Sequence, residues 1–309
     1  MGVGAFVSAG RSLETALQRV ELAERLGYES AYVTHLAARD SLSVLMAYAM
    51  RSERIRIGSG VMPIYSRTPV ATAQAAATID EVSGGRLVLG LGVSHRPVVE
   101  GWYGTEIGKP VREMREYVGI LRAIFRGEDP PQGERFRSGF RFMGIEPRAD
   151  LPIYVAGLSP AMLRLAGELG DGVILWLCNP DYVREVVVPE VTKGRERAGK
   201  GLDGFDIVAA VPTAVTDSPE EAREKLRADL VPYFHLPFYK AMIERSGFPT
   251  DAGAPDDFLD VLAAIGSAEE ATASVDRYRE AGATSPCIGP IPKTDFDRSL
   301  EALAHLAAG

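Results

Sequence analysis

The sequence predicts an α/β protein, a (β/α)8 TIM barrel with insertions. Eight short apolar segments alternate with amphipathic segments of helical period along the chain, the order expected for parallel strands joined by helices. The apolar segments are nearly continuous, as in strands that are buried on both faces. A length of 309 residues suits one such barrel, so we expect a single domain over residues 1–309.

The first half of the sequence contains four predicted strand–helix units. Ser12 is placed to cap the first helix, and Gly27 is placed to end it. Before the fourth helix, a loop containing glycine and proline is expected up to Pro110. The expected strands are 2–7, 30–35, 55–61 and 86–93, and the expected helices are 12–27, 40–52, 70–85 and 111–127.

The second half repeats the pattern. Its helix starts are marked by capping residues, several of them followed by proline at the first helical position. These pairs are Ser159-Pro160, Asn179-Pro180 and Ser218-Pro219, and capping boxes are expected for Ser218 with Glu221 and Ser267 with Glu270. The expected strands are 151–157, 171–177, 205–215 and 284–291.

Two segments exceed a minimal barrel. Residues 128–150 contain paired prolines and alternating apolar and basic residues, which indicates a hairpin or a long loop. Residues 231–257 extend the seventh helix with an aromatic-rich stretch that ends in a loop. Long insertions often cover active sites, so we expect both at or near the mouth of a pocket or at an interface.

Composition excludes several classes of partner. The formal net charge of −8 argues against nucleic acid and against anionic membrane surfaces. Neither a signal peptide nor a membrane-spanning run is evident, so a cytoplasmic protein is expected. The two cysteines, Cys178 and Cys287, have no metal-type spacing, and no metal site is expected.

Function in such a barrel lies at the carboxyl ends of the strands. Few of the residues expected there are ionic, and they form no convincing carboxylate pair, Ser-His-Asp set or metal cluster. A pocket rim rich in glycine and apolar groups suits a planar cofactor that supplies its own chemistry. The candidates are His35, Gly60 to Tyr65, Gly92 to His95, Gly157 to Ser159, Trp176 to Asn179 and Ile288 to Pro290.

Two of these candidates have an ordinary structural interpretation as well. The stretch GLGVSH lacks the third glycine of a dinucleotide-binding motif, and a tight turn explains it better. For His35, a structural role and a functional role are equally supported by the sequence.

The segments ERLGYESAYVTH, GSGVMPIYSRTPVATAQAAATIDEVSGGRLVLGLGVSH, PIYVAGLSPAMLRLAGELGDGVI and YREAGAT together resemble the bacterial-luciferase-like flavin enzymes. More narrowly, they resemble the oxidoreductases of that family that use the deazaflavin coenzyme F420. The resemblance covers nearly the whole sequence. It implies a luciferase-like TIM barrel, bound F420, a small-molecule substrate and a homodimer.

The resemblance also implies site residues. The backbone at Gly60–Val61 is expected to bulge, with a non-prolyl cis peptide, so that Val61 and Met62 back one face of the coenzyme ring. The resemblance places His35 beside ring and substrate. Because hydride movement at a carbonyl or alcohol also moves a proton, His35 is expected to transfer it, with His95 in reserve; for an activated alkene, Tyr65, another side chain or water could supply the proton. The cofactor-binding set is completed by Gly92, Val93, Ser94, Ala156, Gly157, Leu158 and Ser159, of which the last three approach the tail phosphate.

The function expected from the resemblance is hydride transfer between F420 and a small organic substrate. Two alternatives stay open: an FMN-dependent monooxygenase fed by a separate reductase, and a flavin-binding relative without catalysis. The acidic residue that often precedes the family's histidine is Thr34 here, so the alcohol-oxidising arrangement is not simply copied.

Overall fold

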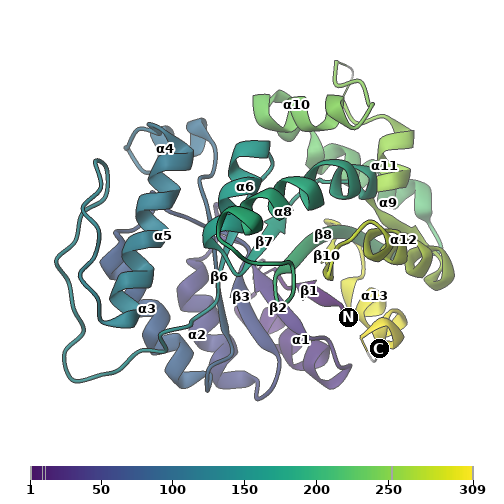
Figure 1. Ribbon diagram of the computed structural model, residues 1–309. Coiled ribbons are helices and arrows are strands. Elements are labelled where there is room, and N and C mark those ends of the chain that lie inside the picture. The colour runs from purple at the N-terminus through teal and green to yellow at the C-terminus, as the bar shows by residue number, and fades with distance from the viewer. Residues whose placement is uncertain (1, 9, 11, 252, 308–309) are drawn as a thin grey trace.

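A computed structural model describes residues 2–8, 10, 12–251 and 253–307. Within that part of the chain, eight parallel strands form a closed barrel, and the predicted fold is confirmed (Figure 1). The barrel closes because β10 pairs in parallel with both β1 and β8. The barrel strands are β1 (Gly4–Phe6), β2 (Ser30–Val33), β3 (Arg56–Ser59), β5 (Leu87–Gly92), β6 (Ile153–Ala156), β7 (Gly172–Leu175), β8 (Asp206–Val215) and β10 (Ser285–Pro290).

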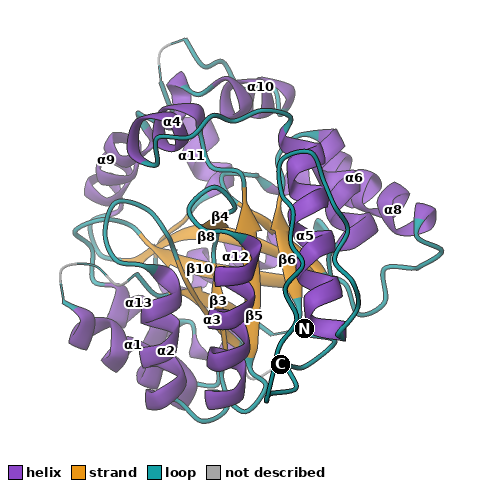
Figure 2. Cartoon of the chain, turned by 90° about the vertical axis from the view of Figure 1, so that its left-hand side faces the viewer, coloured by secondary structure: helices purple, strands orange, loops and turns teal. Residues whose placement is uncertain are grey.

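Helices surround the barrel on its outside (Figure 2). Their apolar faces pack against the outer faces of the strands and bury the main hydrophobic core there. The helices are α1 (Leu13–Arg25), α2 (Ser41–Arg51), α3 (Pro69–Val82), α4 (Arg96–Trp102), α5 (Pro110–Arg126), α6 (Pro160–Leu169), α7 (Pro180–Tyr182), α8 (Val188–Arg197), α9 (Pro219–Leu230), α10 (Pro237–Arg245), α11 (Asp256–Leu262), α12 (Ala268–Glu280) and α13 (Phe296–Ala302). A π-helical turn (Val183–Val187) joins α7 to α8, and 3-10 turns lie at Tyr233–His235 and Ala304–Leu306.

Most predicted caps are confirmed. The side chains of Ser12, Ser159 and Asn179 each accept a backbone N–H in the first turn of their helices. Ser267 and Glu270 form the predicted capping box. The capping box predicted for Ser218 is wrong: its side chain makes no capping hydrogen bond, and the Glu221 carboxylate pairs instead with Lys225, at 2.8 Å.

Three short elements were not expected. The predicted strand over 55–61 ends at Ser59, and the chain re-pairs as β4 (Met62–Pro63) beside β5. Strand β9 (Ala264–Gly266) extends the edge of β8 beyond its pairing with β10. The segment expected as a loop before Pro110 contains α4.

The barrel interior holds its own apolar cluster, separate from the outer core. The Tyr32 ring fills the space beside Gly58, where a Cβ would lie only 2.6 Å from a ring carbon of Tyr32. Val61 and Trp176 are partly buried and pack against this cluster. Its buried members are Phe6, Tyr32, Val88, Tyr154, Ile174, Val208, Ala210 and Cys287.

At Gly90, strand β5 approaches the end of β3 more closely than any side chain at that position would allow. A Cβ on Gly90 would lie 1.9 Å from the Ser59 carbonyl oxygen. Two hydrogen bonds join the strands at this point: Ser59 Oγ donates to the Gly90 carbonyl at 2.8 Å and accepts the Gly90 N–H at 3.0 Å. This contact fixes where the chain leaves β3.

The insertion 128–150 is a long loop that runs beside α5, without helix or strand in its residues (Figure 1). The Glu116 carboxylate on α5 accepts the N–H groups of Glu134, Arg135 and Phe136, at 2.9 to 3.1 Å. The Phe136 ring lies edge-on to Tyr117 with the ring centroids 5.1 Å apart. The loop is therefore held to the first half of α5.

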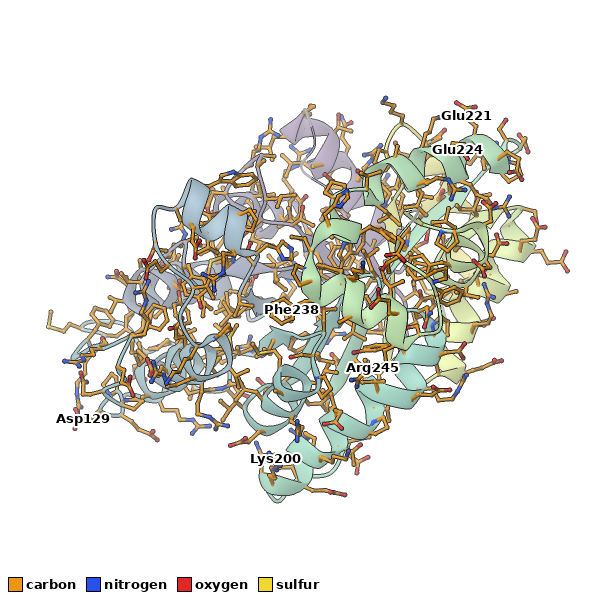
Figure 3. The ribbon with its side chains drawn as sticks, turned by 90° about the horizontal axis from the view of Figure 1, so that it is seen from above. Asp129, Lys200, Glu221, Glu224, Phe238 and Arg245 are labelled. Carbon is orange, nitrogen blue, oxygen red and sulfur yellow. The ribbon has the colours of Figure 1, made fainter. Side chains whose placement is uncertain are left out.

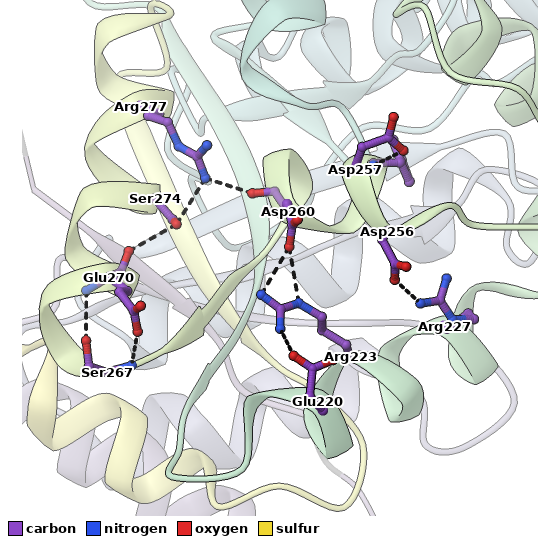
Figure 4. A network of polar contacts seen from close by, with 11 residues as sticks. Glu220, Arg223, Arg227, Asp256, Asp257, Asp260, Ser267, Glu270, Ser274 and Arg277 are labelled. Atoms are coloured by element: carbon purple, nitrogen blue, oxygen red, sulfur yellow. Dashed lines mark hydrogen bonds and ion pairs between the residues drawn. The ribbon is translucent and has the colours of Figure 1, made fainter.

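The insertion 231–257 carries α10 and leads into α11. Ion pairs join α11, at the carboxyl end of the insertion, to α9. Arg227 pairs with Asp256 at 2.5 Å, and Arg223 pairs with Asp260 at 3.1 Å (Figure 4). Seen from above, α10 places Phe238 near the middle of the view (Figure 3). Phe238 is 64% exposed.

The β3–β5 contact gives a test of stability. Gly90→Ala inserts a methyl group against the Ser59 backbone, so we expect the free energy of unfolding to fall by about 1–3 kcal/mol or more. The matched control is Gly101→Ala on α4, where a Cβ meets no atom within 4 Å. That change removes a helical glycine and should raise stability by about 0.5 kcal/mol. Urea unfolding of both variants is the measurement, and equal stabilities would contradict the steric account.

Candidate functional site

The site is built around the peptide that follows β3. The Gly60–Val61 peptide bond is cis, as predicted. Gly60 donates its N–H to the Val33 carbonyl at 2.8 Å, which ties the bulge to the end of β2. A Cβ on Gly92 would lie 2.6 Å from Val61 Cγ2 and 3.5 Å from the Ala156 Cβ. The structure thus brings together Gly60, Val61, Gly92 and Ala156.

Met62 differs from the expectation. Its side chain is completely buried in the outer core, so it presents no apolar surface at the carboxyl end of the barrel. That surface comes from Val61 and from Trp176, which both pack on top of the barrel's interior cluster. Alternation of side chains along an extended segment explains the difference, because neighbours point to opposite faces.

The loop after β6 leads into α6 and offers backbone donors. Ser159 caps α6, and its Oγ accepts the Met162 N–H at 3.3 Å. Tyr182 donates its hydroxyl to the Leu158 carbonyl at 2.6 Å. Because a trans peptide is planar, the Ser159 N–H points to the side opposite that carbonyl. A Cβ on Gly157 would crowd Leu163 at 3.3 Å, so glycine permits the close turn.

Unusual backbone geometry gathers at this end of the barrel. Among the described residues, the non-glycine positions with positive φ are Ser94 (55°), Leu177 (60°) and Lys293 (61°). Each lies in the segment that follows a barrel strand: β5, β7 or β10. Such conformations cost about 1–3 kcal/mol each and concentrate at functional sites.

His35 lies just after β2, and its side chain is 10% exposed. Nδ1 accepts the Ser41 N–H at 3.2 Å and lies 3.0 Å from Ser41 Oγ. Because Nδ1 accepts the backbone N–H, the proton of the neutral ring is assigned to Nε2. Nε2 has no partner among the residues that the structure describes.

The charge state of His35 follows from its surroundings. Burial lowers its pKa below the ordinary value of 6.5; the Asp40 carboxylate, 3.7 Å from Nδ1, opposes the shift, and Arg67 adds to it. Asp40 is itself paired with Arg67 at 2.6 Å, which weakens its pull on the ring. His35 is therefore a neutral hydrogen-bond donor at pH 7.

His95 begins α4 and lies in an aromatic cluster. Its ring centroid is 5.5 Å from that of Tyr239 and 6.5 Å from that of Tyr233. Tyr233 also lies 6.0 Å from Trp176, centroid to centroid. Burial lowers the pKa of His95. The insertion 231–257 thus covers the ends of β5 and β7.

The Tyr65 hydroxyl donates its hydrogen bond within the protein, to Glu113. The hydroxyl lies 2.6 Å from the Glu113 carboxylate, and both side chains are buried. Burial, and then the hydrogen bond to Glu113, raise the pKa of Tyr65. The pair joins the loop after β4 to the start of α5.

Two clefts have comparable volumes. One, of about 320 Å3, is lined by Arg122, Asp171 and Lys200 and lies at the amino ends of β6 and β7, away from the candidate residues. The other, of about 300 Å3, adjoins His35. Position in the barrel decides between them, since sites lie at the carboxyl ends of strands.

Sequence reasoning missed residues that come from distant segments. Tyr182 and Tyr239 were not singled out from the sequence, and Arg39 and Arg67 carried no motif. A signal was available for Arg39, which follows His35 by four residues in the same strand-to-helix loop.

Among the described residues, no group of three or more His, Cys, Asp or Glu side chains is arranged to hold a metal ion. No described helix is long and apolar enough to cross a membrane.

Comparisons with known proteins agree with this geometry. The family model described as luciferase-like monooxygenase matches residues 1–285. A 5,10-methylenetetrahydromethanopterin reductase of Archaeoglobus fulgidus is 30% identical over 92% of each chain. The Mycobacterium tuberculosis protein named "Putative coenzyme F420-dependent oxidoreductase Rv3520c" is 29% identical, over 86% of this chain and 87% of its own. The solved structure of an F420-dependent secondary alcohol dehydrogenase with an F420–acetone adduct superposes with a TM-score of 0.83 at 20% identity, over 99% of this chain and 97% of that one.

The protonation of His35 can be measured directly. The chain has four histidines, so their imidazole proton NMR signals can be assigned with one substitution each. We expect the His35 signal to titrate with a midpoint below 6.5. The unfolded chain then takes up the proton first as the pH falls through 6.5, and folded stability decreases over that window. A midpoint at or above 6.5 would contradict the assignment.

Proposed function

The chain belongs to the luciferase-like monooxygenase family, and within it we propose an oxidoreductase that uses coenzyme F420 on a small organic substrate. The observation that carries the proposal is the apolar surface of Val61 and Trp176 above the barrel's interior cluster. Both side chains are partly buried and carry no formal charge, which suits an uncharged aromatic ring. The sequence relatives favour F420 over FMN as the group it holds.

The residues present fit such a coenzyme. Gly92 lets the Val61 side chain pack against the backbone of β5, because a Cβ at that position would lie 2.6 Å from Val61 Cγ2. The Ser159 N–H and the start of α6, a helix of ten residues, suit a phosphate group. We assign the ring to Gly60, Val61 and Gly92, and the tail phosphate to Gly157, Leu158 and Ser159.

A bound deazaflavin supplies hydride transfer. The protein's part is to position the reactants, exclude water and handle polarity at the substrate. Val61 covers one face of the ring site, which leaves the other face for substrate. His35 donates the hydrogen bond of Nε2 to the substrate oxygen or nitrogen, and its lowered pKa keeps the ring neutral in that role. The aromatic cluster around His95 shields the site from water.

Titration with each coenzyme tests the proposal. We expect F420 to bind with a saturable change in its fluorescence, and reduced F420 to be reoxidised by a member of a panel of small ketones, imines and activated alkenes. FMN binding with oxygen consumption would favour the monooxygenase instead. Binding of either group without turnover across the panel would favour a non-catalytic relative.

The role of His35 is tested with His35→Ala and His35→Gln, with coenzyme affinity and turnover measured separately. Loss of the Nε2 donor in the alanine variant should lower kcat on the order of a hundredfold, with near-normal F420 affinity. The glutamine variant keeps an N–H donor and should recover part of the rate. Unchanged turnover in His35→Ala would remove His35 from the catalytic residues.

We also propose that the protein is a homodimer, as the family resemblance implies. Light scattering should then give twice the mass of one chain, 33.3 kDa, at micromolar concentration. The mass of a single chain across a broad range of concentrations would contradict this.

A further inference from the structure

We propose that the cleft beside His35 is a subsite for an anionic group, so that the substrate carries a carboxylate or a phosphate. That the bound anion is a substrate rests on the proposed function. The anion subsite itself is inferred from the side chains that line the cleft. Its volume of about 300 Å3 accommodates such a group with part of a carbon skeleton. The polar side chains that line it are His35, Arg39, Asp40, Ser66, Arg67 and Tyr103.

The cleft is positive although the chain is acidic. Arg39 and Arg67 bring two guanidinium groups, and Asp40 brings one carboxylate. With His35 neutral, the lining carries one net positive charge, whereas the whole chain carries −8. A local field of opposite sign concentrates anions against the surrounding potential. Guanidinium groups match carboxylate and phosphate oxygens with paired N–H donors.

His35 supplies a donor that nothing in the described protein uses. The side chain is nine-tenths buried, Nδ1 is occupied by Ser41, and the ring lines the cleft. Nε2–H is the remaining polar atom of the ring, and solvent reaches it, since it is not among the buried side-chain atoms that lack a hydrogen-bond partner. The Tyr103 hydroxyl likewise has no hydrogen-bond partner among the residues that the structure describes. A ligand oxygen in the cleft satisfies such donors.

The cationic groups are held in place. Arg67 pairs with Asp40 at 2.6 Å, and Asp40 is fixed as the cap of α2 by the Ser43 N–H at 2.9 Å. The backbone of Arg67 is also anchored, because Tyr117 donates its hydroxyl to the Arg67 carbonyl at 3.1 Å. Arg39 donates to the Gly10 carbonyl at 2.5 Å. Preorganised donors lose less entropy on binding.

The position of the cleft defines the substrate class. His35 is shared between the cleft and the proposed site of chemistry, so the anionic group lies close to the reacting carbon. This describes a small oxo or hydroxy acid, its imine, or a phosphorylated analogue, and it disfavours a neutral alcohol. An acidic coenzyme tail has the same chemistry, so the experiment must separate the two sources.

The first arm uses the protein without coenzyme and two probes, inorganic phosphate and acetate. Each should shift the His35 imidazole signal saturably in NMR titrations. Arg39→Gln should weaken this binding about tenfold, and Arg39→Lys should weaken it less. The matched control is Arg54→Gln, which makes the same charge change at the amino end of β3. No saturable shift in the native protein, or equal weakening in the control, would overturn the subsite.

The second arm measures F420 affinity in the same variants by fluorescence. We expect Arg39→Gln to bind F420 within about twofold of the native protein. A tenfold loss would assign the cleft to the coenzyme tail and overturn the substrate inference. Failure of F420 to bind the native protein would refute the proposed function while leaving the first arm intact. Circular dichroism of each variant establishes that it is folded.

Discussion

The close approach of β3 to β5 sets the position of the candidate site. Glycine at positions 90 and 92 lets the chain after β3 lie against β5, and Ser59 bridges the gap with two hydrogen bonds. The bulge at Gly60–Val61 then re-pairs as β4 and delivers Val61 to the top of the barrel's interior cluster. A side chain at either glycine would displace the bulge. The geometry of the candidate site therefore depends on how closely β3 packs against β5.

The two sides of the site have different chemistry. Near Val61 and Trp176 the surface is apolar, and aromatic rings from the insertion 231–257 enclose it further. Near His35 the surface is polar and cationic, with Arg67 fixed by Asp40. A flat coenzyme suits the first side and a small charged substrate suits the second. In the proposed arrangement, His35 acts between the two sides as a neutral donor, because burial opposes its protonation.

The sequence was sufficient for the barrel but not for the site. Alternation of apolar runs and helices predicted every barrel strand, because buried parallel strands must be apolar. Strands of two or three residues such as β4 and β9 carry too few residues for a periodic signal. The Ser218 capping box was predicted from spacing, yet the Glu221 carboxylate forms an ion pair with Lys225, one helical turn further along α9. Met62 was expected at the ring face, whereas side-chain alternation buries it. The cationic cleft joins Arg39, Arg67 and Tyr103, whose proximity depends on the closed fold.

A crystal structure of the protein with F420 bound tests the central claim most directly. We expect the ring to lie against Val61, with the tail phosphate at the Ser159 N–H and the cleft beside His35, Arg39 and Arg67 left free for substrate. A ring bound in the cleft between Arg122 and Lys200, or a tail phosphate seated on Arg39 and Arg67, would contradict it.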